Sequence, residues 1–371
     1  MMSDAESLVA LPKLSEFYRG KRVFVTGHTG FKGSWMSLWL KRLGAEVTGF
    51  SLPLSAGPSL FQLAKIGAGL TSIWGEVRDS AALVDALKHA GPAVVFHLAA
   101  QPLVRLSYAD PVATFAVNVM GTVNLLEAVR QTPSVEAVAI ITSDKCYENR
   151  EWVWGYREHE PMGGTDPYSC SKGCAELVTA AYRRSFFGKA GGPAVGSCRA
   201  GNVFGGGDWS ADRLIPDIAR AILAGKPVAL RNPHSVRPWQ HVLEPLSGYL
   251  LLAARLADDG RDKTTYAEGW NFGPNPGSDL TVEQLARLMV AHWGNGQIEV
   301  GRDANAPHEA HTLRLDSSKA RHMLGWSPLL SLDESIRWTV DWYRLSAEEP
   351  EAVAALTNAQ IDEYASRMGD C

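Results

Sequence analysis

Long hydrophobic runs are missing from this chain of 371 residues. No apolar stretch approaches the roughly 18 to 20 residues that cross a bilayer, and the polar start MMSDAESLVALPKLSEFYRG lacks the basic and then apolar pattern of a signal peptide. We therefore expect a cytoplasmic protein. A net charge of -4 is spread without long blocks of one sign, which leaves no footprint for nucleic acid or for an anionic membrane. Small-molecule chemistry is the favoured class of function.

Cysteine is scarce, and no two cysteines form a CxxC pair. The odd count of five suits reduced thiols better than a disulfide framework. Cys170 and Cys174 could face each other on a helix, but no His or Cys ligand stands near them. His97 and His241 are far apart and have no carboxylate at ligand spacing. We expect no metal site, and we interpret all the cysteines as structural or incidental: Cys146, Cys170, Cys174, Cys198 and Cys371.

The composition is that of an ordinary globular protein, with 46% apolar and 20% charged residues, and the length is enough for two lobes. Residues 21–27 have the pattern of a buried strand, 34–44 that of a helix, and 45–52 that of a second strand. The alternation continues with strands at 70–77, 92–100, 135–143 and 194–204 and helices at 80–91 and 121–132. Apolar strands separated by helices predict a parallel sheet covered on both faces, that is, a doubly wound, Rossmann-type α/β domain.

The pattern changes after about residue 205, where segments rich in Gly and Pro separate shorter helices from isolated strands. We expect a smaller mixed α/β lobe on the strand ends, with helices at 212–225, 281–294 and 331–345. The predicted division is a cofactor domain at 18–205, to which 238–268 returns, a substrate lobe at 206–237 and 269–345, and a helical extension at 346–371 that ends in an exposed helix.

A glycine-rich turn joins the first strand to the first helix. TGHTGFKG places Gly27, Gly30 and Gly33 where bare backbone lets a pyrophosphate reach a helix N-terminus, so we predict a dinucleotide site. The second strand ends in GFS without the acid that grips an NAD ribose, and the choice between NAD and NADP therefore stays open on local grounds. Glu76 has two interpretations, as a contact to the adenine or as a solvated surface acid.

A Tyr-x-x-x-Lys motif lies downstream of this turn. Tyr168 and Lys172 are one helical turn apart, and a nearby ammonium lowers the pKa of a phenol so that it can act as a base. Alone, the motif also describes an ordinary pair on a helix surface. Ser143, Asp144 and Lys145 end an apolar run, and the carboxyl ends of strands are where doubly wound sheets bind ligands.

Together these motifs resemble the extended short-chain dehydrogenase/reductase superfamily over nearly the whole chain: TGHTGFKG, HLAAQ, FAVNVMGT, the 143–172 cluster, RAGNVFG and NFGP. The resemblance implies that NAD is the cofactor, that the substrate is a nucleotide sugar held by the smaller lobe, and that Ser143 hydrogen-bonds the reacting hydroxyl. It implies a homodimer through a four-helix bundle, built from the helix after FAVNVMGT and the Tyr168 helix. It also implies cofactor contacts from Phe31, Lys32, Val77, Leu98, Ala99, Ala100 and Asn118, beside the three glycines and Glu76.

The dehydratases of this superfamily carry an Asp and then Glu or Lys at positions 144 and 145. The resemblance therefore implies that Asp144 protonates the departing O6 hydroxyl while Lys145 removes the C5 proton, once C4 has been oxidised. A lysine can be that base only if burial or nearby positive charge lowers its pKa. The competing interpretation is an Asp-Lys surface pair at a strand end.

The form with lysine, together with CYENREWVWGY, DPYSCSKGCAEL and RPWQHVLEPL, is similar to the branch that acts on CDP-glucose, whereas thymidine-linked members carry Asp-Glu. The resemblance thus implies CDP-glucose as substrate and a product used for the deoxysugars of surface polysaccharide of the O-antigen type. No physical argument from these residues separates cytosine from thymine. Expected substrate contacts are Gln101, Asn202, Arg213, Arg237 and His241; either arginine could instead be a surface residue.

Other functions stay open at this point. Trp152, Trp154 and Tyr156 lie in a long connection that has two interpretations, a lid over the site or a cover for apolar surface. The rival activities are another nucleotide-sugar dehydratase, linked to dTDP or GDP, and a 4-epimerase. A protein that senses NAD(P) without catalysis is the alternative of a different class. It is disfavoured because it needs no Ser, Tyr and Lys set.

Overall fold

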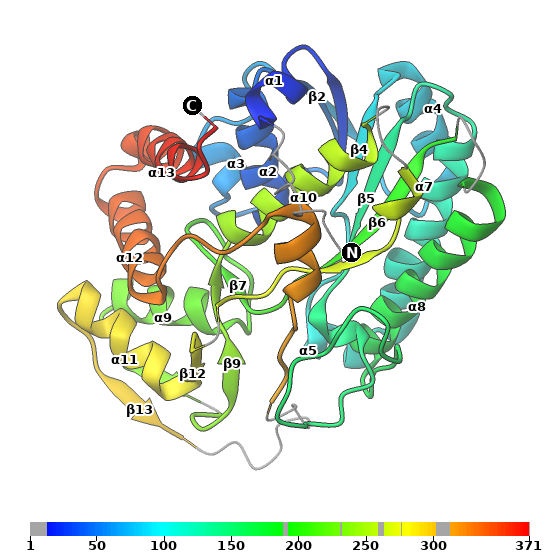
Figure 1. Cartoon of the computed structure of the whole chain (residues 1–371). Coiled ribbons are helices and arrows are strands. Elements are labelled where there is room, and N and C mark those ends of the chain that lie inside the picture. The colour runs from blue at the N-terminus through cyan, green and yellow to red at the C-terminus, as the bar shows by residue number, and fades with distance from the viewer. Residues whose placement is uncertain are drawn as a thin grey trace, which may run out of the picture.

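A computed structural model describes residues 13–187, 192–230, 232–258, 263–275, 277–301 and 312–370. Its centre is a seven-stranded sheet in the order β11-β6-β5-β4-β1-β2-β3, and all neighbouring strands run parallel (Figure 1). The strands are β1 (Arg22–Thr26), β2 (Glu46–Ser51), β3 (Thr71–Trp74), β4 (Val94–His97), β5 (Ala137–Ile141), β6 (Ala194–Arg199) and β11 (Gly269–Asn271). The predicted doubly wound α/β class is confirmed.

Alternate residues of each strand enter two different cores. In β1, Val23 and Val25 belong to one hydrophobic cluster and Phe24 to the other, and β4 divides in the same way between Phe96 and Val95. One core lies under α2 (Phe31–Arg42) and α10 (Leu243–Leu256), the other under α4 (Ser80–Ala90), α7 (Gly121–Arg130) and α8 (Pro167–Tyr182). Burial on both faces is why these strands are apolar throughout rather than alternating with polar residues.

The strand order reverses beside β1. The chain runs outward from β1 to β3 and then returns to β4 on the other side of β1, so the connections leave β1 and β4 in opposite directions. Such a switch point opens a crevice at the carboxyl ends of the two strands. The phosphate loop and the HLAAQ segment both begin there.

One helical stretch differs from the sequence expectation about long apolar segments. Residues 111–130 run continuously through α6 (Pro111–Phe115), a π-helical turn η1 (Ala116–Met120) and α7, and by length and hydropathy alone this helix is apolar enough to cross a membrane. In the structure it packs against α4 and α8, and 44% of its most apolar window is buried. Packing within the cofactor domain therefore accounts for only part of its apolar composition.

The smaller lobe is built from short pieces. It pairs β8 (Val228–Leu230) with β13 (Ile298–Val300), and β9 (Val236–Pro238) with β12 (Asp279–Thr281); β7 (Val203–Phe204) pairs with β10 (Gln240–His241) where the lobe joins the domain. Its helices are α9 (Leu214–Leu223), α11 (Val282–Trp293) and α12 (Leu332–Glu348). The elements of this lobe lie at the lower left of Figure 1, beside the carboxyl edge of the sheet.

Two details differ from the predicted division. The strand β11 completes the central sheet, so the cofactor domain continues past residue 268. The last helix α13 (Val353–Arg367) is not an exposed appendage, because Thr357, Ile361 and Tyr364 are buried and Arg42 of α2 pairs with Asp362. The short helices α1 (Leu14–Tyr18), α3 (Leu60–Leu63) and α5 (Val104–Ala109) and the turn η5 (Ala320–Leu324) complete the main elements.

Candidate active site

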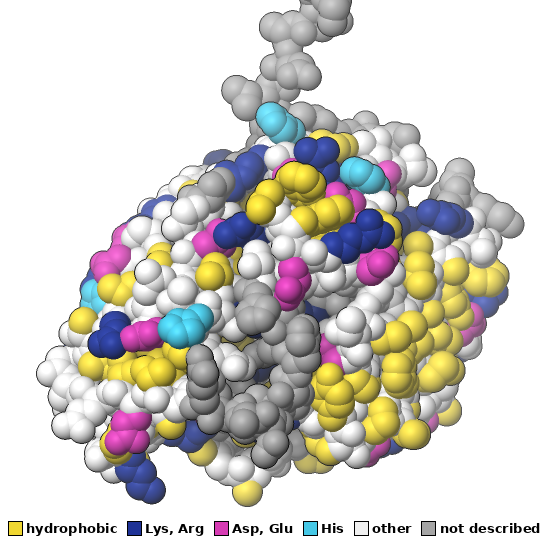
Figure 2. Space-filling view, turned by 90° about the horizontal axis from the view of Figure 1, so that it is seen from below, with side chains coloured by type: hydrophobic (Ala, Val, Ile, Leu, Met, Phe, Trp, Pro, Cys, Tyr) yellow, Lys and Arg dark blue, Asp and Glu magenta, His cyan; other side chains and the backbone are white. Residues whose placement is uncertain are grey.

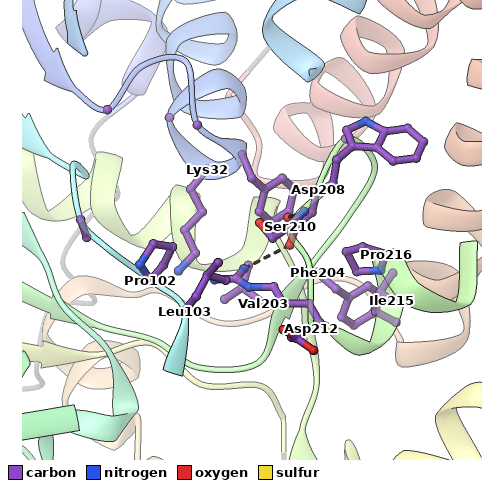
Figure 3. Close-up of a pocket in the computed structure, with 18 of the residues that line it drawn as sticks. Lys32, Pro102, Leu103, Val203, Phe204, Asp208, Ser210, Asp212, Ile215 and Pro216 are labelled. Atoms are coloured by element: carbon purple, nitrogen blue, oxygen red, sulfur yellow. Dashed lines mark hydrogen bonds and ion pairs between the residues drawn. The ribbon is translucent and has the colours of Figure 1, made fainter. Parts of the chain in front are cut away.

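A cavity of about 970 Å³ lies between the cofactor domain and the smaller lobe. Its walls are the phosphate loop, the segments that follow β4 and β5, the first turns of α8, and the smaller-lobe segments 207–218 and 228–230. Figure 3 shows side chains from both parts converging on it. The cavity therefore sits at the carboxyl edge of the sheet, where a doubly wound fold places its ligand.

The phosphate loop cannot hold side chains at its glycines. A Cβ on Gly33 would stand 2.0 Å from the carbonyl oxygen of Gly27, and one on Gly27 would stand 2.8 Å from the backbone nitrogen of Ala99. Gly27 also has φ +72°, a conformation that favours glycine. Gly30 is the N-cap of α2 and offers no side chain to the first turn, so the N–H groups of that turn face the cavity. These residues fit a dinucleotide pyrophosphate.

Lys32 extends from the first turn of α2 into the cavity, toward Leu103 and Val203 (Figure 3). Burial, followed by the positive charges of Arg213 and Lys172, lowers the pKa of Lys32 to about 7. A phosphate placed beside it would favour the charged form and draw a proton onto the amine. Lys32 can therefore adjust its charge to an anionic ligand.

The remaining predicted cofactor residues divide into two groups. Leu98, Ala99 and Ala100, at the end of β4, and Phe31 line the cavity, as do Glu76 and Val77 after β3. The carboxylate of Glu76 forms an ion pair with Arg78 at the rim. Asn118 does not line the cavity.

Asn118 instead fixes the loop that follows β4. Its side-chain oxygen accepts a hydrogen bond from the backbone N–H of Gln101 (2.8 Å), and its amide donates to the carbonyl of Gln101 (3.0 Å) and to Ser171 (2.8 Å). Gln101, expected at the substrate, also lies outside the cavity lining, because its amide is used on Thr114 (2.9 Å) and Leu103. Both polar groups are satisfied within the protein and hold the cavity wall in place.

The end of β5 presents three polar side chains in succession. Ser143 is the N-cap of a short turn at Asp144–Cys146: its oxygen accepts from the backbone N–H of Lys145 (3.2 Å), and its hydroxyl donates to Asp144 (3.0 Å). Asp144 is only 3% exposed and also accepts from the amide of Asn202 (3.4 Å). Ser143, Asp144 and Lys145 all line the cavity.

Gly201 and Asn202 shape the space around the Asp144 carboxylate. A Cβ on Gly201 would lie 1.8 Å from an oxygen of Asp144, so only glycine fits there. Asn202 has φ +49°, which is uncommon for a residue with a side chain and is typical of functional sites. The RAGNVFG segment therefore supports the acid from behind and lines the cavity at Asn202.

Tyr168 and Lys172 approach the same strand end from α8, which begins at Pro167 behind the N-cap Asp166. Burial raises the pKa of Tyr168 to about 12, against lowering influences led by a hydrogen bond to Ser143 and the charge of Arg213. Burial lowers the pKa of Lys172 to about 8, and its amine donates to the carbonyl of Ile141 (3.3 Å). All five predicted catalytic residues thus line one cavity.

The residues predicted to bind the substrate phosphates continue the cavity lining from Asp144 into the smaller lobe. Asn202, Arg213 and Arg237 line it, and Arg213 forms an ion pair with Asp208 (3.1 Å). Arg237 is buried and donates to the carbonyl of Val236 (2.9 Å). The guanidinium groups are therefore present where an anion could bind, and both already have partners.

His241, predicted to contact the substrate, lies away from the cavity lining. The side chain is fully buried outside the cavity lining, with its ring edge-on to Trp35, Phe204 and Trp338. Burial lowers its pKa to about 3, so it is neutral. Trp239, two residues earlier in the chain, lines the cavity, but β10 turns the side chain of His241 into the core.

The long connection between β5 and α8 covers apolar surface. The ring of Trp152 packs on Trp154 and Tyr156, and the backbone of Tyr156 pairs with Leu315. Trp152, Trp154 and Tyr156 are not among the residues that line the cavity. The structure favours the covering interpretation over a lid for residues 152–156.

Some cavity residues were missed by sequence reasoning. Arg105 on α5 forms an ion pair with Asp212 (3.7 Å) across the cavity mouth, joining the two lobes. Asp208 holds Arg213, and its backbone carbonyl accepts from Tyr343. The GGGDW motif carried a signal for Asp208, while Arg105 and Asp212 stand in segments without a distinctive pattern.

Comparison with known proteins identifies the class. A family model described as GDP-mannose 4,6 dehydratase matches residues 24–339, and the chain belongs to this family of nucleotide-sugar dehydratases. Among solved structures, a dTDP-glucose 4,6-dehydratase of Streptomyces venezuelae with NAD bound is 26% identical, with a TM-score of 0.75 and coverage of 89% of this chain and 99% of that one. The UDP-glucose 4-epimerase of Thermus thermophilus in complex with NAD is 27% identical, with a TM-score of 0.73, covering 87% and 99%.

A much more similar relative narrows the class. The CDP-glucose 4,6-dehydratase of Salmonella typhimurium is 54% identical over 354 residues, which are 94% of this chain and 98% of the relative. A dTDP-glucose 4,6-dehydratase of Xanthomonas campestris is 26% identical over 335 residues. This chain is therefore far more similar in sequence to the cytidine-linked relative than to the thymidine-linked one.

Proposed function

We propose that this chain is a hydro-lyase that converts CDP-glucose to CDP-4-dehydro-6-deoxyglucose and water, with NAD as the cofactor. The observation that carries the proposal is the Asp144-Lys145 pair, which lines the same cavity as Ser143, Tyr168 and Lys172. Identity of 54% to a CDP-glucose 4,6-dehydratase over almost the whole chain supports the same activity. An enzyme that only exchanged hydride at C4 would have no use for that additional acid and base.

The first step of the proposed reaction, oxidation at C4, takes place at the cofactor end of the cavity. NAD bound in this cavity would accept the hydride from C4 and return it to C6. Residues 27–33 would hold its pyrophosphate at the start of α2, and Lys172, which lines the same cavity, would bind its ribose hydroxyls. Tyr168 removes the proton of the C4 hydroxyl, which Ser143 holds by a hydrogen bond. Burial raises the pKa of Tyr168 to about 12, while the hydrogen bond to Ser143 and the charge of Arg213 favour the ionised form that a base needs.

The elimination uses the two residues after Ser143. A ketone at C4 acidifies the C5 proton, which Lys145 removes, and Asp144 delivers a proton to the O6 hydroxyl, which leaves as water. Asp144 is held on both sides, by Ser143 and Asn202, so its carboxyl group is fixed before the substrate arrives. Burial of Asp144 excludes bulk water from the reacting atoms.

Assembly, location and pathway are part of the proposal. Exposed apolar side chains stand on or near the two helices, α7 and α8, proposed to form a homodimeric four-helix bundle: Leu177 on α8, Val112 and Met120 on the α6 and η1 turns that lead into α7, and Leu106 and Tyr108 on α5. Figure 2 shows hydrophobic side chains gathered on the side of the molecule where α7 and α8 lie in Figure 1. We propose a cytoplasmic homodimer whose product feeds the synthesis of deoxysugars for O-antigen-type polysaccharide.

The test is a substrate panel. The purified protein with NAD is incubated with CDP-glucose and separately with the thymidine, uridine and guanosine analogues, and the products are analysed by mass and NMR. We expect a 4-keto-6-deoxy product from CDP-glucose in clear preference to the others. Equal or better turnover of the thymidine analogue would contradict the assigned nucleotide, and a C4 epimer without loss of water would contradict the assigned reaction.

A further inference from the structure

Three buried polar residues follow one another on the inner face of α8. Tyr168, Lys172 and Glu176 are spaced one helical turn apart, and they are 8%, 6% and 4% exposed. The first two belong to the proposed chemistry, whereas Glu176 does not line the cavity and contacts no reacting atom. A buried carboxylate at this position is costly unless its charge and hydrogen bonds are satisfied, so it needs an account.

The carboxylate of Glu176 joins the ends of two sheet strands. One oxygen accepts a hydrogen bond from Thr142 (2.5 Å), the residue between the carbonyl that holds Lys172 and the catalytic Ser143. The other oxygen accepts from Ser197 (2.7 Å) and from the guanidinium of Arg199 (2.8 Å), both on β6. Glu176 is therefore tied to the end of β5, which carries Ser143, Asp144 and Lys145, and to β6 beside it.

The charge of Glu176 is permanent and acts on Lys172. Burial alone would raise the pKa of Glu176, but the charge of Arg199 and the hydrogen bonds from Arg199, Thr142 and Ser197 hold it below its ordinary value. For Lys172, burial lowers the pKa and the Glu176 charge is the largest influence that raises it. The Cys146 thiol also raises it, but burial keeps that thiol uncharged near neutral pH.

Other titratable groups near Lys172 do not replace Glu176. His97 at the end of β4 is buried and neutral, because burial and the charge of Lys172 lower its pKa to about 3. Lys32 on α2 and Lys172 repel each other, since the charge of Lys172 lowers the pKa of Lys32. Without the carboxylate, Lys172 would keep the repulsion from Lys32 and lose the largest influence that raises its pKa.

We infer that Glu176 is a positioning residue of the reaction: with Arg199 as its counter-ion, it keeps the Lys172 ammonium protonated and fixes the strand end that carries Ser143. This deepens the proposed function and rests on it for the roles of Tyr168 and Lys172. Arg199 extends the network, because it also donates to the hydroxyl of Tyr147 (2.6 Å), which in turn donates to Asn271 on β11 (2.7 Å). The hydrogen-bond network behind Lys172 thus reaches three strands of the sheet, β5, β6 and β11.

The test compares pH profiles of charge variants. In Glu176→Gln, the alkaline limb of kcat/KM for CDP-glucose should move to lower pH by about one unit or more, because Lys172 loses its proton earlier. Arg199→Gln removes the charge that chiefly holds the pKa of Glu176 down, so the buried carboxyl should take up a proton and the limb should again move to lower pH. In the double variant the carboxylate is already absent, so its limb should lie no lower than that of Glu176→Gln.

A second readout needs no turnover. The side-chain titration of Lys172 is followed by NMR on protein labelled with ¹⁵N-lysine, without cofactor or substrate, and the signal is assigned with a Lys172→Arg variant. It should show the same order of pH midpoints. If the wild type failed to dehydrate CDP-glucose, the proposed function would fall, while this titration would still decide the role of Glu176.

Ser197→Ala is the matched control, because it removes one hydrogen bond from the same carboxylate but no charge. It should lower thermal stability and leave the alkaline limb and the Lys172 titration where they are. Should Glu176→Gln fail to fold, Arg199→Gln carries the same comparison, and Glu176→Asp, which keeps the charge, serves as a second control. A Lys172 titration that does not move in any charge variant, with loss of thermal stability alone, would reduce Glu176 to a structural residue and overturn the inference.

Discussion

The two ends of the cavity are built in different ways. At the catalytic end, Ser143, Asp144 and Lys145 follow a central strand, and Tyr168 and Lys172 stand on a helix of 16 residues packed against it. At the nucleotide end, the walls are two-stranded pairs and loops, and Arg213 is paired with Asp208. The sheet fixes the catalytic groups before any ligand binds, whereas the nucleotide end must exchange existing partners for phosphate oxygens.

The catalytic end should give the largest effects. Tyr168→Phe removes the base while keeping the ring that fills the same space, so oxidation at C4 should fall by roughly 10²- to 10⁴-fold. The rate of NAD reduction after mixing with CDP-glucose measures this step. NAD binding, followed separately by fluorescence, should change little. Turnover equal to that of the wild type would remove Tyr168 from the mechanism.

Lys145→Met separates elimination from oxidation. The variant should still reduce NAD in the presence of CDP-glucose but should lose water at least roughly 10²-fold more slowly, because no base takes the C5 proton. Rapid-quench analysis of the sugar by mass follows water loss directly. Dehydration at the wild-type rate would assign the C5 base to another residue.

The nucleotide end should give smaller effects, seen mainly in KM. Arg237→Met removes a buried cation, and KM should rise about tenfold or more with kcat little changed, as expected for a hydrogen bond to a charged group. Arg213→Met should likewise raise KM, and it should have a second effect on the pH profile. Because the Arg213 charge lowers the pKa of Tyr168, its loss should also move the acidic limb of the pH profile to higher pH.

An acidic limb that stays in place in Arg213→Met would show that the two ends are electrostatically independent. Arg220→Met is the matched control. Arg220 lies on the same helix α9, is paired with Asp217, and does not line the cavity. It should change neither KM nor the pH profile.

The smallest expected effect lies outside the cavity, on stability. Glu244 is buried and accepts hydrogen bonds from Tyr364 of α13 and from the backbone of Leu329 and Leu330, and burial raises its pKa from 4.5 to about 7. A raised carboxyl pKa stabilises the fold below the unfolded value and loses that contribution as the pH rises through about 7. The contribution is at most roughly 3 kcal/mol.

Glu244→Gln should therefore flatten the dependence of thermal stability on pH between about 4.5 and 7, the window between the two pKa values. The comparison is made by calorimetry on both proteins across that range. Tyr364→Phe, which removes one donor and no charge, should lower stability without flattening it. Parallel curves for the wild type and Glu244→Gln would contradict the protonation of Glu244 in the fold.

The sequence was a better guide to the catalytic end than to the nucleotide end, for a physical reason. The phosphate loop and the Tyr168–Lys172 pair depend on local spacing along a strand, a turn and a helix, and local spacing survives folding. His241, Gln101 and Asn118 lie outside the cavity lining, because the direction of a side chain at a short strand or loop is decided by tertiary packing. Strand β11 escaped assignment to the sheet because three residues carry too little pattern.

The polar network behind the site was equally invisible in the sequence. Glu176, Arg199 and Thr142 are each unremarkable in a linear reading, and their contact spans the ends of two strands and a helix. Likewise, Arg105 and Asp212 come from different lobes. Contacts between residues so far apart in the chain carry no periodic signal, so only the structure could bring them together.

In the proposed reaction, C4 is oxidised, water is eliminated across C5 and C6, and C6 is reduced in one cavity within a single turnover. The most direct measurement uses CDP-glucose deuterated at C4 in ordinary water, with the product analysed by mass and NMR. We expect the deuterium to move from C4 to C6 of a 4-keto-6-deoxy sugar. Deuterium returned to C4, with the hydroxyl inverted and no water lost, would identify an epimerase and contradict the account.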